Sequence, residues 1–254
     1  MYRIGIDLGG TNIAVGLVDE NANILHSDSV PTIKERHWSE IIRDMAALSK
    51  KVVADAGHTM DEVAAVGIGC PGTIDKANGV VVYSNNIVMD HVPMAAEFRK
   101  HIDLPVFLEN DANAAAWGEA VAGAARGTDT SLMITLGTGV GGGVVVDGRI
   151  VAGCNGGAGE LGHITVEPAE TVPCACGKYG CLEQYASANG IVRLAKRMLA
   201  ESGKPSALRA RETFTSKDIC DLAQQGEEMA AEIVDRFGEY LGRALSYVSC
   251  AVDP

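Results

Sequence analysis

The sequence lacks the features that mark membrane-spanning and nucleic-acid-binding proteins. No apolar run reaches the roughly 18 residues of a membrane helix, and the N-terminus carries no signal-peptide pattern. No basic run stands out, and the formal net charge is −12, whereas affinity for nucleic acid comes largely from Lys and Arg on phosphates. We therefore expect a protein of the reducing cytoplasm that binds no membrane and no nucleic acid.

The sequence also lacks a P-loop, since the pattern G-x-x-x-x-G-K-[ST] does not occur in it. Gly137, Gly139 and Gly142 match G-x-G-x-x-G by letter, but a dinucleotide-binding fold needs a helix after that turn. Here residues 144–148 read VVVDG, which predicts a strand and a hairpin turn. The remaining interpretation is a glycine-rich β-hairpin that binds phosphate through its backbone amides, helped by the Thr138 hydroxyl.

Another glycine-rich turn, DLGGTN at residues 7–12, follows the first predicted strand. Asp7 can hold a hydrated Mg²⁺, while Gly9, Gly10 and Thr11 let backbone N–H groups approach a phosphate. An ordinary hairpin turn explains the same residues equally well, because three β-patterned runs at the start of the chain predict a meander.

Cysteine is concentrated in one segment. Cys174, Cys176 and Cys181 fall close together, and His163 stands upstream of them. Three thiolates and one imidazole make the closed tetrahedral set that structural Zn²⁺ prefers. A disulfide is disfavoured, because the count of seven cysteines is odd and no signal peptide is recognised. The other four cysteines have no metal-like partners in sequence, and we expect them to be small buried apolar residues.

Two carboxylates flank this cysteine segment. Glu160 precedes His163 by three residues, and Glu183 follows Cys181 by two. Carboxylates at such positions are commonly only solvated. On a loop that a bound metal holds in place, they can instead bind a polyhydroxy ligand in a fixed geometry.

Length and composition suit a globular protein, since 254 residues with 47% hydrophobic and 21% charged residues allow two modest domains. Periodicity predicts a helix over residues 38–56, a buried strand over 106–108 and an Ala-rich helix over 112–125. Further helices are predicted over 186–200, 216–224 and 227–250.

Three polar residues, Glu109, Asn110 and Asp111, lie between the strand at 106–108 and the helix at 112–125. Ligands of α/β folds bind at such carboxyl ends of strands. Alternatively, Asn110 or Asp111 only caps the helix, although a cap needs one such residue and not three.

Four motifs in this order resemble those of the ROK family of bacterial sugar kinases, in the actin-like ATPase superfamily. They are DLGGTN, ENDANAAAWGE, LGTGVGGG and the pair GELGH and CACGKYGCLE, and they span the chain. The last pair looks closest to the glucokinase branch. The resemblance implies an α/β, two-domain actin-like ATPase (ribonuclease H-like) fold with an interdomain cleft. It also implies an N-terminal domain over 1–111, a larger C-terminal domain with the zinc loop over 112–254, and a homodimer.

The resemblance also implies residue roles. Asp111 would be the catalytic base that accepts the proton of the sugar hydroxyl. The sugar-binding positions would be Asn86, Asn110, Asp111, Glu160, His163 and Glu183. The positions that cradle ATP and Mg²⁺ would be Asp7, Gly9, Gly10, Thr11, Asn12, Gly137, Thr138 and Gly139. The Zn²⁺ ligands would be His163, Cys174, Cys176 and Cys181.

The expected activity is that of an ATP-dependent hexose kinase, a glucokinase that forms glucose 6-phosphate. Mannose, allose or an N-acetylhexosamine such as N-acetylmannosamine are alternative substrates, and polyphosphate is an alternative donor. A sugar-sensing transcriptional regulator is the rival from another class, but such relatives carry an N-terminal helix-turn-helix, and the first strand here starts at Arg3. Family members continue beyond the final Asp-Pro, so we expect the closing C-terminal elements to be absent from this chain.

Overall fold

A computed structural model describes residues 1–84 and 87–254, and the chain forms two compact units. Unit 1 comprises Met1–Thr128 and Ala152–Ala158, and unit 2 comprises Asp129–Val151 and Gly159–Pro254. The boundary expected from the sequence lies after residue 111. In the structure, unit 1 continues through helix α3 (Asp111–Ala122), because this helix packs against the central strands of unit 1.

Unit 1 is built on a five-stranded sheet with the order β3-β2-β1-β4-β8. Its strands are β1 (Tyr2–Leu8), β2 (Asn12–Val18), β3 (Ile24–Pro31), β4 (Val63–Cys70) and β8 (Val106–Asn110). The first three strands pair antiparallel, which confirms the predicted meander, whereas β4 is parallel to both β1 and β8. The carboxyl ends of β1, β4 and β8 therefore share one edge of the sheet, and Asp7 on β1 pairs in register with Gly69 on β4.

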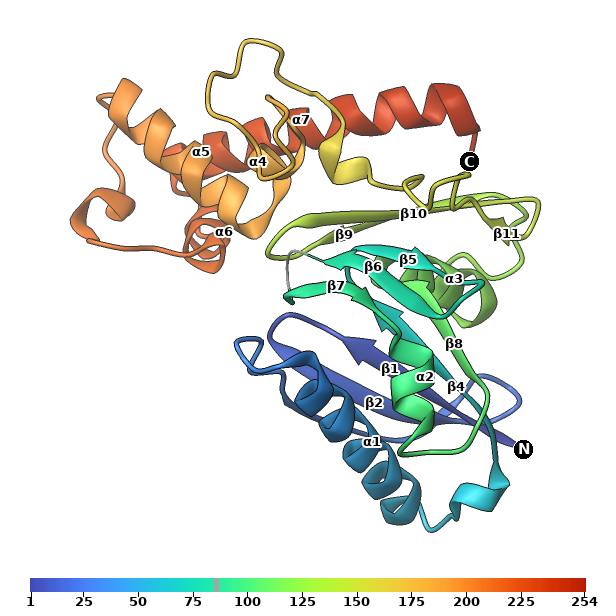
Figure 1. The fold of residues 1–254 in the computed structure, drawn as a ribbon. Coiled ribbons are helices and arrows are strands. Elements are labelled where there is room, and N and C mark those ends of the chain that lie inside the picture. Colours follow the sequence, from blue (N-terminus) through green and yellow to red (C-terminus); the bar gives the residue numbers. More distant parts are fainter. Residues whose placement is uncertain (85–86) are drawn as a thin grey trace. The chain divides into compact units, whose positions relative to one another are not determined.

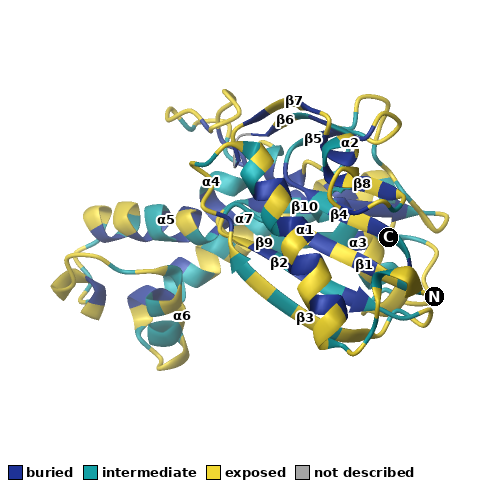
Figure 2. Ribbon diagram, turned by 60° about the horizontal axis from the view of Figure 1, so that its bottom comes forward, coloured by how far each residue is buried: buried dark blue, intermediate teal, exposed yellow. Residues whose placement is uncertain are grey.

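Helix α1 (Trp38–Asp55) packs against β2 and β3, and its bounds confirm the helix predicted over 38–56. One side of it is buried and the other exposed, as the alternating colours of Figure 2 show. The remaining elements of unit 1 are η1 (Met60–Glu62), α2 (Met94–Arg99) and a small sheet of β5 (Thr73–Asp75), β6 (Val80–Ser84) and β7 (Met89–Val92). The buried side chains of the two sheets, α1 and α2 form one continuous core.

Unit 2 begins with the antiparallel strands β9 (Ser131–Leu136), β10 (Val140–Val146) and β11 (Arg149–Ile150). A strand therefore follows the glycine-rich turn, as the sequence predicts, and the dinucleotide interpretation is excluded. The chain continues through η2 (Leu161–His163), α4 (Glu183–Ala186), α5 (Ala188–Glu201), η3 (Ala207–Ala210), α6 (Ser216–Gln224) and α7 (Glu228–Val252). The three predicted C-terminal helices are confirmed in α5, α6 and α7.

The expectation that the four cysteines outside the metal segment are buried is wrong for three of them. Cys70 is fully buried in the core of unit 1, but Cys154, Cys220 and Cys250 are exposed. Cys220 and Cys250 lie on the exposed faces of α6 and α7. The small apolar character of cysteine does not by itself tell which face of a helix the residue occupies. None of the helices in the described part of the chain combines the length and apolar character needed to span a bilayer.

Candidate functional site

Two acidic residues meet at the carboxyl edge of the sheet in unit 1. Asp7 lies near the end of β1, and Asp111 begins α3 directly after β8. Between them, Gly69 on β4 lies so close that a Cβ atom there would be 3.5 Å from the Cα atom of Asp111. Desolvation by burial and then the charge of Asp111 raise the pKa of Asp7. Two carboxylates held this way favour a divalent cation nearby, because its charge offsets their repulsion.

The buried thiol of Cys70 lies behind this pair. Burial and then the charges of Asp111 and Asp7 hold its pKa well above the usual range, so Cys70 stays a neutral thiol. It therefore adds no third negative charge beside the two carboxylates.

Asn110, and not Asp111, caps α3. The side-chain oxygen of Asn110 accepts a hydrogen bond from the Asn113 N–H at 3.1 Å, which makes Asn110 the N-cap. Its amide nitrogen donates to the Gly72 carbonyl at 3.2 Å. Among the described residues, the Asp111 carboxylate accepts one hydrogen bond, from the N–H of Ala112 at 2.9 Å, in a first turn where the helix dipole favours an anion.

Glu109, the residue before the cap, is held by Lys76, whose role was not predicted from the sequence. Glu109 forms an ion pair with Lys76, which lies in the turn between β5 and β6. The other carboxylate oxygen of Glu109 accepts a hydrogen bond from the N–H of Asn110 at 3.0 Å. Of the three polar residues at the junction of β8 and α3, Glu109 is thus paired, Asn110 caps the helix, and Asp111 has the least committed carboxylate.

The glycine turn between β1 and β2 is a tight hairpin turn, with the Gly9 N–H donating to the Asn12 carbonyl at 3.0 Å. A Cβ atom on Gly9 would stand 2.9 Å from that carbonyl oxygen, so a side chain there would force a shift. The fully buried Thr32 fixes the turn from behind, because its hydroxyl donates to the Gly9 carbonyl at 2.6 Å and its N–H to the Thr11 carbonyl at 2.9 Å.

In unit 2, the four residues proposed as metal ligands converge. Their ligand atoms all lie within 4.8 Å of one another, with 3.6 Å between the Sγ atoms of Cys176 and Cys181 and 3.8 Å between Cys174 Sγ and His163 Nδ1. Ligands at about 2.0 to 2.3 Å from a tetrahedral Zn²⁺ stand roughly 3.4 to 3.8 Å apart, so these two spacings fit this ion. The Sγ atoms are too far apart for a disulfide, whose bond is about 2.05 Å long.

The loop reaches this geometry through two glycines. Gly177 and Gly180 have φ angles of +84° and +69°, a backbone conformation that glycine adopts readily and that lets the loop fold its sulfurs together. A Cβ atom on Gly180 would lie 1.9 Å from the Glu167 carbonyl oxygen, so this position admits only glycine. Burial and then the neighbouring Cys176 and Cys174 thiols raise the pKa of Cys181 to about 12, a cost to thiolate formation that a bound cation would reverse.

The carboxylates that flank the metal set have different surroundings. Glu160 is exposed and does not cap η2 through its side chain. Glu183, at the start of α4, accepts a hydrogen bond from the N–H of Val140 at 3.0 Å, so it reaches the turn between β9 and β10. Thr138 at the tip of that turn is exposed. Asn86, predicted to bind sugar, lies outside the described residues.

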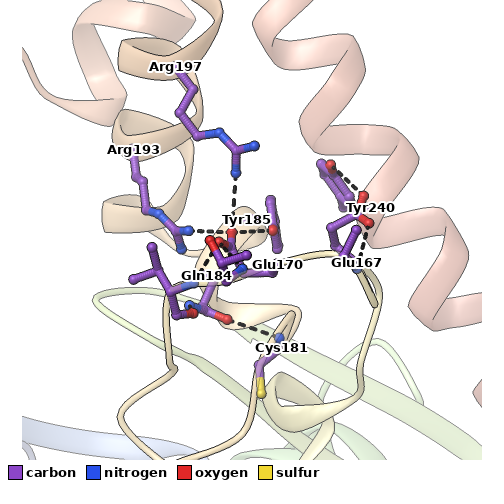
Figure 3. Close-up of polar contacts among 11 residues, drawn as sticks. Glu167, Glu170, Cys181, Gln184, Tyr185, Arg193, Arg197 and Tyr240 are labelled. Carbon is purple, nitrogen blue, oxygen red and sulfur yellow. Dashed lines mark hydrogen bonds and ion pairs between the residues drawn. The ribbon is translucent and has the colours of Figure 1, made fainter.

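A buried glutamate between His163 and Cys174 was not predicted, and Figure 3 shows its contacts. The Glu170 side chain is 3% exposed, and its oxygens accept from the Tyr185 hydroxyl at 2.5 Å and from the N–H groups of Thr171 and Val172. Its ion-pair partners are Arg193 and Arg197 of α5. Although burial acts to raise it, these hydrogen bonds and the charge of Arg193 bring the pKa of Glu170 down to about 2.

We expect Glu170→Gln to lower the free energy of unfolding at pH 7 by about 3 kcal/mol, since each unit of pKa shift corresponds to about 1.4 kcal/mol. The unfolded Glu170 takes up its proton near pH 4.5 and the folded one only near pH 2. This stabilisation is therefore fully present above pH 4.5 and is lost as the pH falls toward 2. Urea unfolding of both proteins between pH 7 and pH 3.5 should show the difference shrinking. A constant difference, or an equal loss in the exposed control Glu212→Gln, would contradict this role.

Several sugar kinases resemble this chain over nearly all of its length. A glucokinase of Halalkalibacterium halodurans is 38% identical over 260 residues, which cover 100% of this chain and 78% of that protein. A glucokinase of Thermotoga maritima is 42% identical over 251 residues, covering 96% of this chain and 76% of that protein. The structure of a ROK family glucokinase from Streptomyces griseus in complex with glucose and AMPPNP matches with a TM-score of 0.81 and 37% identity, over 100% of this chain and 81% of that one.

These matches define the fold class as the α/β fold of the actin-like ATPases, as the sequence analysis predicts. The chain belongs to the ROK family, whose profile matches residues 3–254. It is shorter than the kinases to which it is similar, since it spans 76–81% of their length.

Proposed function

We propose that this protein is an ATP-dependent hexose kinase that phosphorylates glucose to glucose 6-phosphate. Its relationship to the ROK kinases makes it a sugar kinase, and glucokinases are among the relatives that align with nearly all of the chain. The observation that carries the proposal is the position of Asp111. Its carboxylate stands at the carboxyl end of β8, beside Asp7, while the neighbouring Asn110 supplies the helix cap.

In this mechanism Asp111 accepts the proton of the sugar hydroxyl while that oxygen attacks the γ-phosphorus of ATP. One bond forms between the sugar oxygen and phosphorus, and the bond from the γ-phosphorus to the bridging oxygen breaks, so that ADP leaves with the bond's electron pair. Phosphoryl transfer asks the protein mainly for positioning and charge stabilisation. A single carboxylate, held by its helix, selects which hydroxyl can attack.

We assign the sugar contacts to Asn110, Glu160, His163 and Glu183, and Asn86 is kept as a further candidate. Carboxylate and amide acceptors suit a sugar, because the wrong epimer leaves buried acceptors unpaired. In His163 the Nδ1 atom faces Cys174, so Nε2 is the ring nitrogen left to donate to a hydroxyl. Zinc held by the three thiolates and His163 would fix the loop that carries these residues.

The two glycine turns would hold the triphosphate. Backbone N–H groups around Gly10 and Gly139 suit phosphate oxygens, since close approach needs residues without side chains. The N–H of Gly9 already donates to the Asn12 carbonyl, so Gly9 contributes by lacking a side chain. The Asp7 carboxylate, whose pKa is raised beside Asp111, is the ligand that we propose for the hydration shell of Mg²⁺. The remaining members of this cradle are Thr11, Asn12, Gly137 and Thr138.

A coupled kinase assay against a panel of hexoses tests this function. With ATP as donor, we expect kcat/KM for glucose to exceed that for mannose, allose and N-acetylmannosamine by at least roughly 10-fold, the scale on which one misplaced polar group acts. Polyphosphate in place of ATP serves as the comparison donor. A protein that bound glucose tightly but transferred no phosphate from either donor would favour a sugar-sensing regulator instead. Faster turnover of another hexose would reassign the substrate within the kinase class.

A further inference from the structure

The turn between β9 and β10 is held by the segment 183–189, which follows the last cysteine of the metal set. Three hydrogen bonds join this segment to the turn, and all six residues belong to unit 2. The N–H of Val140 donates to Glu183 Oε2 at 3.0 Å, the N–H of Ala188 to the Gly137 carbonyl at 2.8 Å, and Asn189 Nδ2 to the Thr138 carbonyl at 3.3 Å.

The contact is close as well as polar. A Cβ atom on Gly139 would lie 2.3 Å from Glu183 Oε2, so the carboxylate lies directly against bare backbone. The segment is itself well fixed, because the buried Ser187 caps α5 by accepting from the Gly190 N–H at 2.8 Å. A Cβ atom on Gly190 would be 2.7 Å from the Glu183 carbonyl oxygen, so the chain between α4 and α5 is tightly turned.

These bonds fix which way the turn presents its N–H groups. In a planar trans peptide the C=O and the next N–H point in opposite directions. Because the Gly137 and Thr138 carbonyls are both directed toward the segment 183–189, the N–H groups of Thr138 and Gly139 point away from it. Successive backbone N–H groups on one side of a turn form a site that attracts anions.

We propose that the segment 183–189 sets the shape of the β9–β10 turn for ATP phosphate, with Glu183 and Asn189 as positioning residues. The inference rests on the proposed function, in which this turn binds the triphosphate. Glu183 then serves both ligands, because Oε2 accepts from Val140 while Oε1 is left for a sugar hydroxyl. The carboxylate that orients the sugar thus also orients the nucleotide turn.

Titration with AMPPNP and Mg²⁺, and separately with glucose, tests the proposal in the intact chain by calorimetry. Asn189 is exposed, so Asn189→Ala should fold normally, raise the Kd for AMPPNP by about 3- to 10-fold and leave the Kd for glucose unchanged. Glu183→Ala should weaken both ligands. Glu183→Gln keeps an oxygen that can accept from Val140, so it should restore nucleotide affinity while glucose affinity stays low.

Lys196→Ala, an exposed change on the same helix, is the matched control and should leave both Kd values unchanged. Thermal unfolding of each variant shows whether a loss of binding reflects a loss of structure. Unchanged AMPPNP affinity in Asn189→Ala and Glu183→Ala would overturn the positioning role while leaving the kinase proposal intact. A wild-type protein that bound glucose but no AMPPNP would instead overturn the proposed function, and the positioning role with it.

Discussion

Replacing Asp111 with Asn should lower turnover by roughly 10²-fold or more while sugar binding stays nearly intact, which is the usual scale for losing a general base. Asn keeps the size of the side chain and can still contact a hydroxyl, but it cannot take up the proton. The helix should remain in place, because Asn110 and not Asp111 caps it.

The measurement is kcat with saturating glucose and ATP, together with a glucose titration of the same variant. Asp103→Asn, an exposed acid elsewhere in unit 1, is the matched control and should turn over like the wild type. If Asp111→Asn turned over normally, Asp111 would be only the first residue of α3, and the base would have to be sought among other groups.

The sequence predicts best what depends on near neighbours in the chain. Helical periodicity defines α1 within one residue of its observed end, because its apolar side chains recur on one face. The residues after Gly143 exclude a helix there, because valines followed by Asp-Gly favour a strand and a hairpin turn. The clustered cysteines likewise converge in space, since residues so close along the chain need only a glycine-rich turn to meet.

The contacts that the sequence analysis missed join residues far apart in the chain. Thr32 fixes Gly9 from 23 positions away, and Lys76 pairs with Glu109 across 33 positions. Asn189 reaches Thr138 across 51 positions. Thr32, Lys76 and Asn189 belong to none of the four motifs, because the role of each is set by how separate elements pack and not by its local sequence.

The boundary between the two units shows the same limit. An acidic motif between a strand and a helix looks like a natural place to divide the chain, and the sequence analysis does so at residue 111. In the structure, α3 lies against β4 and β8, so its contacts belong to unit 1. Packing of a helix on strands from distant sequence decides the boundary, and a single sequence does not reveal such packing.

The protein should contain about one Zn²⁺ per chain, held by His163 and the three clustered cysteines. A strong chelator should remove it, because the free energy of binding is also what holds the loop closed. We expect glucose affinity to fall by roughly 10-fold or more on metal loss, the scale seen when the fixed orientation of a site is lost. Global stability should change less, since the ladder between β9 and β10 does not involve the metal loop.

Cys176→Ser should reproduce that loss, and Cys220→Ser should not. Both cysteines are exposed, but Cys176 Sγ lies 3.6 Å from Cys181 Sγ, whereas Cys220 lies on α6 outside the cluster. Elemental analysis, glucose titration and thermal unfolding of the two variants separate metal content, sugar affinity and stability. Since Glu183 follows Cys181 by two residues and contacts Val140, metal loss should also weaken AMPPNP binding. Metal-free protein that bound glucose and AMPPNP normally would show that the cluster takes no part in positioning either ligand.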